Sequence, residues 1–74
     1  MEEQIIDIVE ITGFTEVTDT KMTFKALEVE EDAFEDIIQT LEEEFDINIS
    51  PRDAAKLYAG TVDSMIKYVS TKTK

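Results

Sequence analysis

The 74-residue sequence contains no cysteine and no histidine, and only 7 lysines and arginines stand against 18 acidic residues. Without cysteine there is no disulfide framework, no thiolate metal site and no cysteine nucleophile. Without histidine the chain lacks the commonest general base and metal ligand. The acid clusters also lack the ligand spacing and central glycine of an EF-hand loop. We therefore expect neither an enzyme active site nor a metal site.

Long apolar runs are absent too, and none approaches the length that a membrane-spanning segment needs. The opening Met1-Glu2-Glu3 is not typical of a signal peptide, so a cytoplasmic protein is expected. The net charge of −11 disfavours contact with nucleic acid or with an anionic membrane. Between Ala26 and Pro51 there are ten acids and no base, which favours a basic protein partner or a divalent cation. The length predicts a single domain over residues 1–74.

The clearest structural signal is the stretch 30–45, EEDAFEDIIQTLEEEF. Its apolar residues recur every three or four positions, as on one face of an α-helix: Phe34, Ile37, Ile38, Leu41 and Phe45. Nearly every other position is acidic, so the outer face should be negative. The helix dipole disfavours the last acids, Glu42, Glu43 and Glu44, and each costs roughly 0.3–1 kcal/mol of helix stability. Such a helix either serves a binding partner or only keeps a small protein in solution.

Three further helices are predicted, over Glu2–Ile11, Pro51–Leu57 and Thr61–Val69. The first is rich in β-branched residues, which makes a strand the alternative, but no second strand-like run exists to pair with it. Gly13 is placed to cap its C-terminal end. Ser50 is the expected N-cap of the third helix, because a proline follows it at the first helical position. Thr61 is the expected cap of the fourth helix.

The remaining segments are connections and a tail. Residues 14–25 form a long first loop in which Val17, Met22 and Phe24 are the expected anchors to the core. Residues 70–74 are predicted to fray. The sum is an all-α fold of four helices with a short third helix and a long first loop.

Several segments of the sequence resemble the acyl carrier protein family. The most specific is LEEEFDINI, Leu41–Ile49, and the resemblance covers nearly the whole chain. The other matching segments are Gly13-Phe14, Glu16-Val17-Thr18, Phe24 and Leu27 before the second helix, Asp53-Ala54-Ala55-Lys56-Leu57 and Thr61-Val62. The resemblance implies a right-handed four-helix bundle of the carrier-protein type.

The residue that carries the family's cofactor has no counterpart in this chain. In the family, a serine in an Asp-Ser-Leu triad at the start of the second helix receives a phosphopantetheine arm. Here Glu30, Glu31 and Asp32 stand at that place, with Glu31 at the position of the serine. A carboxylate cannot accept the arm as a hydroxyl does, so no cofactor is expected. Without the arm there is no thiol to carry an acyl chain.

The partner-docking surface that the resemblance implies is also changed. In the family it mixes acids with apolar residues along the second helix. The usually apolar positions here hold Asp32, Glu35 and Gln39, whereas the acidic positions stay acidic. The predicted docking residues are therefore all acids: Glu30, Glu31, Asp32, Glu35, Asp36, Glu42 and Glu43.

Two more residues have alternative interpretations. Phe34 stands where the resemblance implies a small polar residue facing an acyl tunnel, so its ring either fills that space or is simply part of the core. The segment Asp63-Ser64-Met65 resembles the modification triad but lies at the start of the fourth helix. An ordinary exposed serine at a helix start is the alternative there.

Three functions are compatible with these features. The leading one is a degenerate carrier that works without an arm, as a monomer, by docking to a basic surface of a partner enzyme or assembly protein. The second is a working carrier in fatty-acid, polyketide or related thioester metabolism, with phosphopantetheine attached to Ser64. The third is an acidic mimic that competes for a basic groove.

Overall fold

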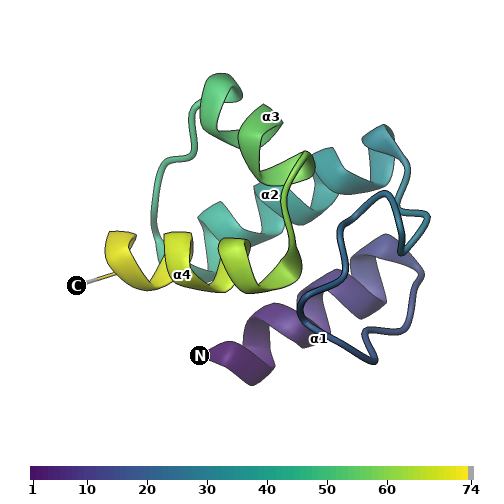
Figure 1. Ribbon diagram of the computed structural model, residues 1–74. Helices are drawn as coiled ribbons and strands as arrows, with labels where there is room; N and C mark the ends of the chain where they lie inside the picture. Colours follow the sequence, from purple (N-terminus) through teal and green to yellow (C-terminus); the bar gives the residue numbers. More distant parts are fainter. Residues whose placement is uncertain (74) are drawn as a thin grey trace.

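Four α-helices form the fold in the computed structural model, which describes residues 1–73 (Figure 1). They are α1 (Glu2–Gly13), α2 (Glu31–Phe45), α3 (Pro51–Tyr58) and α4 (Val62–Lys72). The prediction of an all-α fold with four helices, a short third helix and a long first loop is confirmed. The strand alternative for the first segment is wrong, because residues 2–13 are helical. In the described part of the chain the only β-type pairing is an isolated bridge between Thr23 and Thr61.

Side-chain caps fix the starts of the two C-terminal helices. The Ser50 hydroxyl accepts a hydrogen bond from the Asp53 N–H at 3.2 Å, and the Thr61 hydroxyl accepts one from the Ser64 N–H at 3.1 Å. Both caps agree with the sequence-based predictions. Helix α4 continues to Lys72 where the sequence predicted only a tail, and Lys74 lies outside the described residues.

The end of α1 differs from the prediction. Gly13 is the last helical residue, and Phe14 takes the left-handed conformation with φ of 53°. Gly13 is buried, and a Cβ atom added to it would lie 3.1 Å from Cδ1 of Ile37. The prediction that Gly13 caps the helix is therefore wrong, since its missing side chain permits close packing of α1 on α2 instead.

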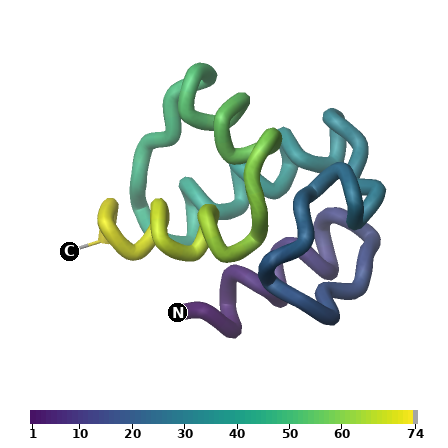
Figure 2. The backbone as a smooth tube through the Cα atoms, viewed as in Figure 1, coloured from purple at the N-terminus to yellow at the C-terminus, as the bar shows by residue number. Residues whose placement is uncertain are grey.

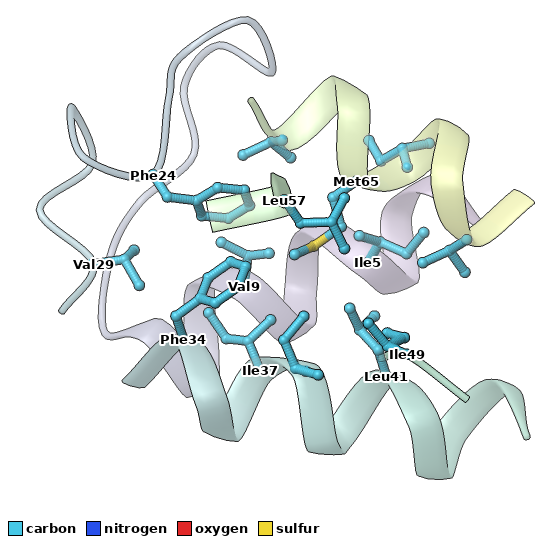
Figure 3. Packing of buried hydrophobic residues seen from close by; sticks show 14 of the residues in the cluster. Ile5, Val9, Phe24, Val29, Phe34, Ile37, Leu41, Ile49, Leu57 and Met65 are labelled. Carbon is cyan, nitrogen blue, oxygen red and sulfur yellow. The ribbon is translucent and has the colours of Figure 1, made fainter. Parts of the chain in front are cut away.

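The hydrophobic core lies between the helices and the long first loop (Figure 3). Its largest fully buried side chains are Ile5, Val9, Phe24, Ile37, Leu41, Val62, Met65 and Val69. The predicted anchor Phe24 is completely buried, whereas Val17 and Met22 are partly buried at the edge of the core. The core thus draws on residues from the loop as well as from the helices.

The first loop, residues 14–30, is held against the start of α4 (Figure 2). Three backbone hydrogen bonds join them: Phe24 N–H to Gly60 O at 3.4 Å, Val62 N–H to Met22 O at 3.3 Å, and Asp63 N–H to Thr20 O at 2.8 Å. At the other end of the loop, the carboxylate of Glu10 accepts the Val17 N–H at 2.8 Å. The loop is therefore an integral layer of the fold.

Three aromatic rings connect the loop to α2 and α3. The Phe34 ring lies edge-on to that of Phe24, with centroids 4.9 Å apart, and 4.8 Å from that of Tyr58. The Tyr58 hydroxyl donates to the carbonyl of Val29 at 2.8 Å. The predicted helix ended at Leu57, whereas Tyr58 is the last residue of α3, and this bond and the ring packing anchor it.

Phe14 gives the first testable prediction. The left-handed conformation costs a non-glycine residue roughly 1–2 kcal/mol, and the Phe14 side chain is exposed, so little burial offsets this cost. Glycine would remove the strain but would add about 0.4–1 kcal/mol of unfolded-chain entropy. We expect Phe14→Gly to raise the free energy of unfolding by about 0.5–1 kcal/mol, measured by denaturant titration.

The matched control for this prediction is Phe14→Ala. Alanine removes the ring but keeps the Cβ atom that disfavours the left-handed conformation. It should therefore give no comparable stabilisation. Equal effects of glycine and alanine would show that backbone strain at this position is not the cause.

Candidate partner-docking site

A groove of about 620 Å³ runs between α2 and α3. One wall is polar and belongs to α2, where it is formed by Glu31, Glu35, Gln39 and Glu42. The floor and the opposite wall are mostly apolar and are formed by Phe34, Ile38, Ile49, Pro51, Ala54, Ala55 and Tyr58. The site thus places carboxylates beside an apolar surface.

The helical repeat divides the acids of α2 into two stripes. Successive residues are about 100° apart around a helix, so acids four and seven positions apart share a face. Glu31, Glu35 and Glu42 form the stripe that lines the groove. The second stripe is one residue further on, Asp32, Asp36 and Glu43, and none of these lines it. The structure therefore brings three of the seven predicted docking residues together at the groove.

The remaining predicted residue, Glu30, is the N-cap residue of α2. It is exposed and makes no side-chain capping bond. Glu31, which the resemblance places at the position of the family's serine, is also exposed and lines the groove. Of all seven, only Glu42 is partly buried.

Glu42 is tied to the connection between α2 and α3. Its carboxylate accepts the Ile49 N–H at 3.0 Å, and its carbonyl accepts the N–H groups of Asp46 and Ile47. The bond from the Ile49 N–H explains why an acid is useful at the unfavourable end of the helix dipole. Its carboxylate has a structural role that the sequence-based interpretation as a docking residue missed.

The inner end of the groove is filled by the core. Phe34 is buried, and its ring lies beside that of Phe24 (Figure 3). On its other side it packs against the ring of Tyr58. The interpretation of Phe34 as a core residue is therefore confirmed.

The α3 side of the groove was not predicted as part of the site. It is lined by two small residues, Ala54 and Ala55, and by Tyr58 four positions after Ala54. The spacing of Ala54 and Tyr58 is the signal that could have placed both on one helix face. Because the predicted helix ended at Leu57, the prediction did not place Tyr58 on this helix face.

Ser64 lies elsewhere, in a smaller groove of about 350 Å³ between α3 and α4. Its hydroxyl is exposed and lies 3.1 Å from that of Thr61. The neighbouring Tyr68 hydroxyl donates to Asp53 at 2.7 Å. Burial, this bond and the charge of Asp53 together raise the pKa of Tyr68 to about 12.

The charge of the docking site is largely uncompensated. Among residues 1–73 the single ion pair joins Lys67 and Asp63 on α4, at 3.3 Å. In the same described residues no group of acids is arranged to hold a metal ion. No helix within residues 1–73 has the length and apolar content needed to cross a membrane.

Comparisons with known proteins identify no relative. No family model matches the chain, and no curated protein or solved structure matches it. The relationship to acyl carrier proteins therefore stays a prediction from the sequence.

Glu42 provides the second testable prediction. Glu42→Ala removes the acceptor of the Ile49 N–H. Glu44→Ala removes an equal charge two residues further along the chain and leaves this hydrogen bond intact. Because a hydrogen bond to a charged group is worth about 1.5–3 kcal/mol, Glu42→Ala should destabilise the fold by about 1.5 kcal/mol more than Glu44→Ala. Urea unfolding of both variants measures this difference, and equal losses would contradict it.

The uncompensated negative charge leads to the third testable prediction, which concerns the effect of salt on stability. Raising ionic strength from about 0.01 M to about 0.15 M shortens the Debye length from about 30 Å to about 8 Å. Repulsion among the acids of residues 26–51 should weaken, so the melting temperature should rise. Differential scanning calorimetry checks this, and a melting temperature that does not change with salt would show that the repulsion is negligible.

Proposed function

We propose that this protein is a degenerate, acyl-carrier-protein-like module that works by binding a partner and carries no phosphopantetheine arm. The partner is a basic, amphipathic surface of an enzyme or assembly protein, and the module acts as a cytoplasmic monomer without catalysis of its own. The observation that carries this proposal is the groove between α2 and α3, with its acidic wall and apolar floor.

The groove supports a partner that is both cationic and apolar. Glu31 and Glu35 are exposed along one wall, and no base occurs between Ala26 and Pro51 to neutralise them. Ile38 and Ala54 offer apolar contact area beside these carboxylates. An amphipathic helix with lysine or arginine beside leucine-like side chains has the chemistry to satisfy both, as in other helix-in-groove complexes.

The absence of an arm is supported by the chemistry of α2. The N-terminal half of α2 presents carboxylates and no hydroxyl nucleophile, and Glu31 occupies the position at which the family carries its serine. The packing of Phe34 between two aromatic rings leaves its space closed to an acyl chain. Both features favour binding through the surface over covalent carriage.

A helical peptide built from leucine and lysine at heptad-like spacing tests the docking proposal. We expect Glu35→Lys to weaken its binding about tenfold more than Asp36→Lys, which is about 1.4 kcal/mol. Both residues are exposed neighbours on α2 and both substitutions reverse one charge, but only Glu35 lines the groove. Fluorescence anisotropy with the labelled peptide measures the dissociation constants.

The same titration distinguishes docking from general charge attraction. Equal weakening by the two reversals would indicate a diffuse electrostatic effect, and would contradict the groove as the site. Binding by wild type should also weaken with salt, because exposed charges act through a screened field. A peptide that does not bind at low salt would overturn the docking proposal.

The second candidate, a working carrier modified at Ser64, is favoured by one observation, the exposure of this hydroxyl. Incubation with coenzyme A and a promiscuous phosphopantetheinyl transferase, followed by mass spectrometry, tests it. We expect no mass increase for wild type. A phosphopantetheine adduct that Ser64→Ala abolishes would favour the working carrier and contradict the proposal above.

A further inference from the structure

The C-terminal end of α1 presents an apolar surface away from the groove. Ile11 is 76% exposed and Phe14 is 90% exposed, and they are three residues apart at this end of the helix. In residues 1–73 the only other large hydrophobic residue classed as exposed is Met1, at the opposite end of α1. Single exposed hydrophobic residues are common on protein surfaces. Phe14 differs from such residues in its backbone as well as in its exposure.

The fold makes no use of the Phe14 ring. The backbone has φ of 53° and ψ of 47°, a conformation that is unfavourable for an aromatic residue. This turn ends α1 through backbone bonds alone, since the N–H groups of Phe14 and Thr15 both donate to the carbonyl of Glu10. Glycine or asparagine would form the same turn more easily. A strained backbone with an unused side chain points to a function outside the chain.

The surroundings of Phe14 define the chemistry of what it contacts. Residues 1–20 contain six acids and no base, and the first bases along the chain are Lys21 and Lys25 in the following loop. Asp7, one turn before Ile11, and Glu16, two residues after Phe14, are both exposed. An apolar anchor among carboxylates is complementary to an apolar recess rimmed by lysine or arginine. A second copy of this chain docking through the same surface, or an anionic membrane, would meet these acids with like charge.

We propose that Phe14, together with Ile11, is the anchor of a second docking surface for a protein partner with an apolar recess and a basic rim. No residue of this surface lines the groove between α2 and α3. The two surfaces are therefore separate, so an experiment can disprove binding at one surface without disproving binding at the other.

The test starts from a photo-crosslinking residue. Phe14→p-benzoylphenylalanine, in the full chain, is irradiated in an extract of the source organism, with Gln4→p-benzoylphenylalanine as the control on an exposed site of the same helix. A protein crosslinked from position 14 and not from position 4 is then purified. Its dissociation constant is measured for wild type, Phe14→Gly, Phe14→Asn and Phe14→Tyr.

We expect Phe14→Gly and Phe14→Asn to weaken binding about tenfold or more, as for a buried aromatic anchor, while Phe14→Tyr stays within about threefold because its ring is retained. Both weakened variants relieve the backbone strain, so unfolding cannot explain the loss. The proposal is overturned if position 14 crosslinks no protein beyond the control or only another copy of the chain. It is equally overturned if the captured protein loses affinity with Glu35→Lys but not with Phe14→Gly.

Discussion

The packing of Phe34 between Phe24 and Tyr58 is the interaction on which the rest of the structure depends. It joins the first loop, α2 and α3, which otherwise share few constraints, and the Tyr58 hydroxyl adds a bond to the Val29 carbonyl. Aromatic pairs of this kind are worth about 0.5–1.5 kcal/mol beyond their burial. The same contacts set the separation of α2 and α3, so the groove exists because the rings hold α3 in place while its two alanines leave space along the wall.

The acids of the chain occupy two physically different environments. The carboxylates of Glu10 and Glu42 each accept a backbone N–H seven residues ahead, and so fix the connections that follow α1 and α2. Glu31, Glu35 and Asp36 are exposed and make no such bond in the described structure. Charge alone therefore does not identify a binding residue, because an acid that holds a loop and an acid that meets a partner look the same in composition.

Local patterns predicted the helices well, whereas contacts between distant residues could not be predicted. The periodicity of α2 and the caps at Ser50 and Thr61 follow from neighbouring residues, and all three agree with the structure. The groove requires Tyr58 to reach Val29, 29 positions away, which no local pattern encodes. The prediction that Gly13 caps α1 was wrong for the same reason, because the role of Gly13 depends on its contact with Ile37 on α2.

The two parts of the groove contribute differently to the binding proposed for it. Exposed charge pairs are worth only about 0–1 kcal/mol each, so the acidic wall alone gives little affinity. Burial of apolar area contributes about 25 cal/mol per Å², so the floor around Ile38 and Ala54 must supply most of the stabilisation. The carboxylates of Glu31 and Glu35 instead select cationic partners and speed their approach. In the proposed module, recognition of charge by Glu31 takes the place of the covalent attachment that the resemblance to the carrier family implies at this position.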